Sequence, residues 1–132
     1  MIAPMSERGA RVTGDMVADF MTQLLGDSRT ESLYAIFLDA QQRLITFELM
    51  ARGDSYSCEF NPGMIVQRAV DLGARSLILA HNHPSGDPTP SAADIQYVNR
   101  LSKACALFQV LLIDSVIVAG EAFTSCRARG LI

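Results

Sequence analysis

The sequence predicts an α/β domain in which helices flank one mixed β-sheet. Segments with helical periodicity alternate with short apolar segments typical of strands, which favours a layered α/β architecture. The first two predicted strands are separated by only a short turn, so they form an antiparallel hairpin and make the sheet mixed. The length of 132 residues fits a single domain of this kind.

Residues that start or stop regular structure bound the predicted elements. Asn61-Pro62 is typical of a helix start, because asparagine caps free backbone N–H groups and proline fits the first helical turn. Thr13 or Asp15 caps the first helix, and Gly26 ends it. In chain order we predict a helix at 16–25, strands at 31–39 and 43–50, a short strand around 55–60, a helix at 61–73, a strand at 76–80, a helix at 91–105, strands at 108–114 and 115–120, and a short edge strand at 122–125.

The N-terminal segment and the cysteines indicate the cellular compartment that we expect for the protein. Residues 1–12 are expected to be a flexible lead-in, and residues 13–132 form the domain. The lead-in lacks the apolar stretch of a signal peptide, and no apolar run approaches the roughly 20 residues of a membrane span. The three cysteines, Cys58, Cys105 and Cys126, show no C-x-x-C spacing and no disulfide framework. We therefore expect a protein of the reducing cytoplasm that is not associated with a membrane.

Charge gives no support to broad binding of nucleic acid. The formal net charge is −3, with 11 basic against 14 acidic residues, and the basic residues are scattered. A small patch around Arg52, Arg68 or Arg127 is the alternative that the sequence leaves open. A zinc deaminase acting on bases would need a C-x-x-C pair, which is absent. Direct binding of nucleic acid is therefore not expected.

The only two histidines, His81 and His83, directly follow the predicted strand at 76–80. In an extended chain, residues two apart point to the same side, so the two imidazoles can converge on one metal ion. The proline-rich segment after them cannot be helical and is expected to form a fixed loop. The alternative interpretation is a pair of polar loop residues.

Asp94 lies in the first turn of the next predicted helix and can supply a third ligand. Ser91-x-x-Asp94 is also a capping-box pattern, and both interpretations can hold together. Two histidines and one carboxylate leave a fourth position for water, which is typical of a catalytic zinc site. Such a site needs a general base. Spacing alone does not choose among Glu31, Glu48 and Glu59.

The pattern H-x-H-x7-S-x2-D, here His81, His83, Ser91 and Asp94, resembles the JAMM motif of the MPN/JAB metallopeptidases. The strings ESLYAIFLDAQQRLI and HNHPSGDPTPSAADI are similar to the bacterial RadC-like branch, and the similarity runs from about Thr13 to the C-terminus. The resemblance implies a three-layer fold, related to that of the cytidine deaminases. It implies that His81, His83 and Asp94 bind Zn²⁺. It also implies that Glu31 is the general base and that Ser91 stabilises the tetrahedral intermediate.

Two positions depart from the branch. Asn61 and Ser115 stand where RadC-like chains commonly have histidine. Neither is a matched ligand, so the departures bear on substrate contacts or on support of the site. The chain also lacks the N-terminal helix-hairpin-helix extension of longer relatives, so we expect it to be the catalytic-type core alone.

The expected function is a zinc-dependent hydrolase in which activated water attacks a peptide or isopeptide amide. Its expected partner is a peptide or an isopeptide-linked protein. One alternative is a non-catalytic MPN-type binding module. Another is a DNA-associated role, because the RadC-like branch carries a historical DNA-repair label. The apolar C-terminal strands could pair with another chain, so a homo-oligomer stays open.

Overall fold

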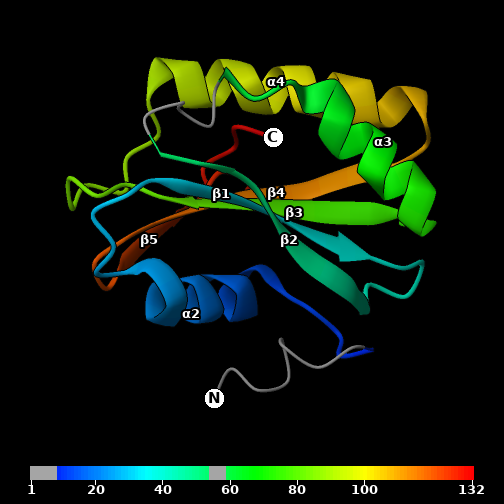
Figure 1. Ribbon diagram of the computed structural model, residues 1–132. Coiled ribbons are helices and arrows are strands. Elements are labelled where there is room, and N and C mark those ends of the chain that lie inside the picture. Colours follow the sequence, from blue (N-terminus) through cyan, green and yellow to red (C-terminus); the bar gives the residue numbers. More distant parts are fainter. Residues whose placement is uncertain (1–8, 54–58) are drawn as a thin grey trace.

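The computed structural model describes residues 9–53 and 59–132, and it shows one five-stranded sheet between two helical layers (Figure 1). The strand order is β2-β1-β3-β4-β5. The predicted strand around 55–60 falls mostly on residues 54–58, which lie outside the described residues. The elements are α2 (Gly14–Leu25), β1 (Ser32–Leu38), β2 (Leu44–Arg52), α3 (Pro62–Leu72), β3 (Ser76–Asn82), α4 (Ala92–Leu107), β4 (Leu111–Ala119) and β5 (Ala122–Ser125).

The sheet is mixed, as the sequence predicts. Strand β1 pairs antiparallel with both β2 and β3, β3 pairs parallel with β4, and β4 pairs antiparallel with β5. Helix α2 covers one face, and α3 and α4 cover the other (Figure 1). The prediction of an α/β fold with helices flanking a mixed sheet is confirmed.

Each face of the sheet carries its own hydrophobic core. Strand β3 is central, and all seven of its residues are buried, because it has helices on both sides. Alternate residues of β1 and β3 therefore enter different cores. The core under α3 and α4 includes Leu33, Phe37, Leu77, Leu79 and Leu101, and the core under α2 includes Met21, Ile36, Ile78, Val116 and Val118.

The helix caps agree with the sequence. Thr13, not Asp15, is the N-cap of α2, and its hydroxyl oxygen accepts a hydrogen bond from the Met16 N–H. Asn61 caps α3 by accepting from the Gly63 N–H at 2.9 Å. Helix α3 ends at Gly73, whose φ of 69° lies in the left-handed region that favours glycine.

The predicted strands at 108–114 and 115–120 are wrong as two elements, because β4 is continuous from Leu111 to Ala119. The polar pair Asp114-Ser115 suggested a break. Both residues are buried inside the strand instead, because hydrogen bonds from residues 125 and 127 satisfy the Asp114 carboxylate. The ladder with β3 accommodates one register shift beside this pair. Helix α4 also runs on to Leu107, two residues further than predicted.

The described part of the predicted lead-in lies against the sheet edge. The Gly9 N–H donates to the Leu44 carbonyl at 2.8 Å, and the Leu44 N–H donates to the Ala10 carbonyl at 2.7 Å. Val12 is fully buried in the core under α2. Residues 9–12 therefore cover the start of the edge strand β2.

Candidate metal centre

The two histidines converge at the end of the central strand. His81 lies in β3 and His83 directly follows it, so their side chains leave the chain on the same side. Their Nε2 atoms are 3.2 Å apart, and the His81 side chain is nearly fully buried. The His83 N–H donates to the Val118 carbonyl at 2.8 Å, which fixes the start of the loop against β4. The convergence expected from the spacing of two residues is present.

Asp94 brings a carboxylate to the same point from the first turn of α4. Its Oδ2 lies 3.1 Å from the His83 Nε2, and its Oδ1 lies 3.4 Å from the His81 Nε2. The capping box is also complete, since the Ser91 N–H donates to the Asp94 Oδ2 at 2.8 Å and the Asp94 N–H donates to the Ser91 Oγ at 3.0 Å. One carboxylate therefore both caps the helix and faces the histidines.

Glu31 is the described glutamate that reaches the histidines. It directly precedes β1, and one carboxylate oxygen of Glu31 and one ring nitrogen of each histidine all lie within 4.8 Å of one another. Glu48 instead forms a two-pronged ion pair with Arg68, at 2.8 Å for both contacts. This pairing lowers the pKa of the Glu48 carboxyl. Glu59 is exposed in the segment before α3 and is not part of the cluster.

The electrostatics of the cluster favour positive charge. The hydrogen bond to Asp94 raises the pKa of His83, and the carbonyl of Asp87 and the charges of Asp94 and Glu31 act in the same direction, against the effect of burial. The His83 Nδ1 lies 2.9 Å from the Asp87 carbonyl, which favours a proton on Nδ1, so that in the neutral imidazole the Nε2 lone pair faces Asp94 and His81 and can act as a ligand. Two imidazole nitrogens around a 97% buried carboxylate form a donor set that zinc accepts. The residues therefore fit a zinc ion.

The remaining sequence-predicted positions lie around this centre. Ser91 is exposed at the N-cap of α4, and its hydroxyl oxygen accepts from Asp94. Asn61 acts as the cap of α3. Ser115 is fully buried, and its Oγ has no hydrogen-bond partner among the described residues. Sequence reasoning gave no role to Asn82, although it stands between the two histidines and is 2% exposed.

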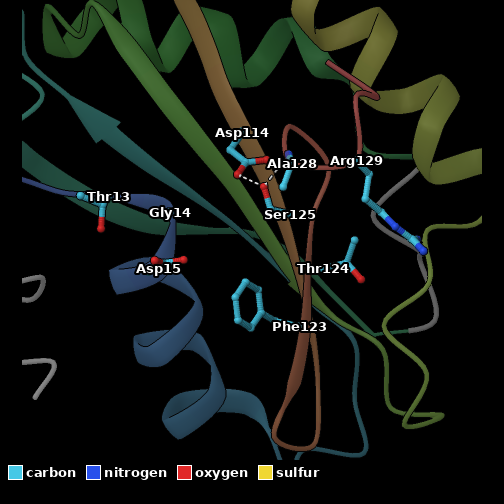
Figure 2. A pocket seen from close by; sticks show the side chains of 9 residues that line it. All are labelled: Thr13, Gly14, Asp15, Asp114, Phe123, Thr124, Ser125, Ala128 and Arg129. Carbon is cyan, nitrogen blue, oxygen red and sulfur yellow. Dashed lines mark hydrogen bonds between the residues drawn. The ribbon is translucent and has the colours of Figure 1, made fainter.

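A separate hollow of about 570 Å³ lies between the start of α2 and the end of β5 (Figure 2). None of the histidines, Glu31 or Asp94 lines it. Asp114 lines its inner wall, where its carboxylate accepts from the Ser125 hydroxyl, the Ser115 N–H and the Arg127 N–H. Protein donors already surround this carboxylate, and no histidine lines the hollow, so it does not offer the donor set of the candidate metal centre.

The arrangement defines a class of protein. A mixed sheet between helical layers, with an H-x-H pair leaving the central strand and a carboxylate from the following helix, is the architecture of a JAB domain. The family model described as the RadC-like JAB domain matches residues 12–131. The chain belongs to the RadC-like JAB domain family.

Similar bacterial proteins support this assignment. A UPF0758 protein of Chromohalobacter salexigens is 40% identical over 125 residues, which cover 94% of this chain and 56% of that protein. A UPF0758 protein of Aquifex aeolicus is 40% identical over 106 residues, covering 80% of this chain and 46% of that protein. A UPF0758 protein of Leptothrix cholodnii is 36% identical over 132 residues, covering 100% of this chain and 60% of that protein. The chain thus spans about half the length of these relatives.

Among the described residues, no helix has the length and apolar character required to cross a membrane.

Proposed function

We propose that this protein is a zinc-dependent hydrolase of the JAMM type that cleaves a peptide or isopeptide amide. The observation that carries the proposal is the convergence of His81, His83 and Asp94 with Glu31 beside them. Zinc held by the two Nε2 atoms and the Asp94 carboxylate would lower the pKa of a bound water and polarise the substrate carbonyl.

The chain's own residues supply the remaining chemistry. Glu31 lies close enough to the histidines to accept a proton from the attacking water and pass it to the leaving amine. Ser91 would donate a hydrogen bond from its hydroxyl to the developing oxyanion, while its oxygen accepts from the Asp94 N–H. Asp94 is held in place by the capping box, which limits its motion. A cytoplasmic location is part of the proposal, supported by the unpaired Cys105 and Cys126.

The test is a hydrolysis screen of the zinc-loaded protein against peptide, isopeptide-linked and nucleic-acid substrates. We expect zinc-dependent cleavage of an amide substrate. Glu31→Gln should retain zinc and lose activity by about 10²- to 10⁴-fold, the usual contribution of a general base. The matched control is Glu48→Gln, which makes the same change in a carboxylate that pairs with Arg68. It should keep the activity.

Four outcomes would count against the proposal. Equal losses in the two glutamine variants would show that Glu31 has no special role. Loss of zinc from Glu31→Gln would make Glu31 a ligand rather than a base. Cleavage of nucleic acid alone would favour a DNA-associated role over a peptidase. Zinc binding without any hydrolysis would favour a non-catalytic binding module.

A further inference from the structure

Asn82 connects the strand of the histidines to the segment of Glu31. Asn82 is the last residue of β3 and is 2% exposed. Its Oδ1 accepts from the Ser32 N–H at 2.8 Å, and its Nδ2 donates to the Thr30 carbonyl at 3.0 Å. These two residues are the immediate chain neighbours of Glu31. One side chain thus contacts the backbone on both sides of Glu31.

The backbone pairing alone does not fix this segment against β3. The antiparallel register between β1 and β3 ends at the pair Leu33 and His81. Beyond that pair, the Asn82 side chain provides the two hydrogen bonds to the segment. On the other side, the Gly53 N–H donates to the Glu31 carbonyl at 2.9 Å, which ties the segment to the end of β2. Asn82 therefore links the segment of Glu31 to the strand that carries the histidines.

The chemistry of the two bonds suits asparagine. The position needs an acceptor for the Ser32 N–H and a donor for the Thr30 carbonyl, and a primary amide offers both. Aspartate offers only acceptors when ionised, and alanine offers neither group. Ser32 is buried, so a lost acceptor leaves its N–H without compensation from solvent.

We propose that Asn82 is a positioning residue that holds Glu31 against the two histidines. Because general-base catalysis requires hydrogen-bond reach, a segment that moves by about 1 Å costs up to about 100-fold in rate. Asn82 acts through the backbone of residues 30–32 and does not touch the reacting atoms. The catalytic part of this inference rests on the proposed function of Glu31, and the structural part does not.

The structural part is tested by amide hydrogen exchange in the zinc-free protein. In Asn82→Ala, we expect the Ser32 N–H to exchange at least about tenfold faster, because its acceptor is gone. The matched control is Asp39→Ala at the opposite end of β1, where Asp39 accepts from the Gln41 and Arg43 N–H groups at 2.9 Å each. This control should speed exchange in its own turn and leave Ser32 protected. Unchanged protection of Ser32 in Asn82→Ala overturns the proposal.

The catalytic part is tested by kinetics and zinc affinity together. For Asn82→Ala, we expect kcat to fall about 10- to 100-fold, with KM and zinc affinity close to wild type. A zinc affinity that falls as far as kcat would mean that Asn82 acts through the histidines, which contradicts the proposal. Unchanged kcat would contradict it as well.

A second variant covers the case in which the alanine variant fails to fold. Asn82→Asp keeps an acceptor for Ser32 but cannot donate to Thr30. We expect Ser32 to stay protected while kcat falls, and wild-type kcat would contradict the need for the amide. If the wild-type protein cleaves no amide, the proposed function fails, and the exchange experiment still decides the role of Asn82.

Discussion

Among the described residues, two aspartates are buried, Asp94 in helix α4 and Asp114 within strand β4, and they have different surroundings. Asp94 is 3% exposed in the first turn of α4, and Asp114 is 5% exposed beside the start of α2. Protein N–H and O–H groups surround Asp114, where three donors point at one carboxylate. Asp94 accepts from the Ser91 N–H but also faces two imidazole nitrogens.

The comparison indicates which surroundings allow a buried carboxylate to act as a metal ligand. A buried charge must be compensated. Compensation by hydrogen-bond donors, as at Asp114, leaves no acceptor for a metal and makes the residue structural. Compensation by basic nitrogens, as at Asp94, leaves a site that a cation can enter. Both side chains are buried, so the groups that face each carboxylate decide its role.

The largest expected effect is on zinc binding. Asp94→Ala should weaken zinc affinity by more than the roughly 10- to 100-fold that the loss of an outer-shell partner costs, because it removes a residue that we propose as a direct ligand. Asp114→Ala should leave zinc affinity unchanged, because Asp114 faces no histidine. Titration with a fluorescent zinc chelator measures both. Equal weakening in the two variants would remove the distinction between the aspartates.

The next largest effect is on stability, where we expect Asp114→Ala to cost more than Asp94→Ala. Asp114→Ala should lower the free energy of unfolding of the zinc-free protein by about 3 kcal/mol, because three donors lose a charged acceptor and two of them belong to the backbone. Denaturant unfolding of the zinc-free variants measures this. A loss below that of Asp94→Ala would show that the Asp114 network is not structural.

A smaller loss is expected for zinc-free Asp94→Ala. Its free energy of unfolding should fall by about 1 kcal/mol, because the capping box loses one hydrogen bond and the helix start loses a carboxylate. Identical melting of zinc-free wild type and zinc-free Asp94→Ala would show that the carboxylate contributes nothing to capping.

The smallest effect is on the pKa of Cys126, which the charges of both aspartates raise. Burial raises the pKa of its thiol to about 11, and the charges of Asp114 and, more weakly, Asp94 act in the same direction. Burial alone raises the pKa of Cys105 to about 11. Alkylation rates against pH should therefore show a lower Cys126 pKa in Asp114→Ala, a smaller decrease in Asp94→Ala, and no change at Cys105. An unchanged Cys126 pKa in both variants would contradict this expectation.

The raised pKa values of Cys105 and Cys126 also lead us to expect that the folded protein loses stability at alkaline pH. A thiol whose pKa is higher in the folded than in the unfolded protein stabilises the fold fully below the unfolded value. For Cys105 and Cys126 this stabilisation should disappear between about pH 9, the ordinary thiol value, and about pH 11. Denaturant unfolding of wild type and a Cys105→Ala variant across this range measures the contribution, and equal slopes would contradict it.

Local patterns predicted most of the fold and part of the site. The spacing of His81 and His83 after an apolar strand predicts their convergence, and Ser91-x-x-Asp94 predicts the capping box, because both depend on residues close in sequence. Glu31 could not be separated from Glu48 and Glu59 by spacing. Only its resemblance to the family position favoured it, and the fold brings it to histidines 50 and more residues away.

Long-range contacts explain what the sequence did not predict. Asn82 was given no role, because its two hydrogen bonds reach residues 50 and 52 positions earlier in the chain. The continuity of β4 was missed for the same reason. Asp114 looks like a turn residue until the donors at Ser125 and Arg127 are brought beside it. Buried polar groups are predictable from sequence only when their partners are local.

The most direct test of the central claim is a crystal structure of the zinc-loaded protein, with diffraction recorded at the zinc absorption edge. We predict one zinc per chain, bound by the Nε2 atoms of His81 and His83 and by an Asp94 carboxylate oxygen at about 2.0–2.2 Å. We also predict that the Glu31 carboxylate lies beyond ligand distance, where it can act as a base. A zinc ion elsewhere, no zinc, or a Glu31 oxygen in place of Asp94 would contradict the account.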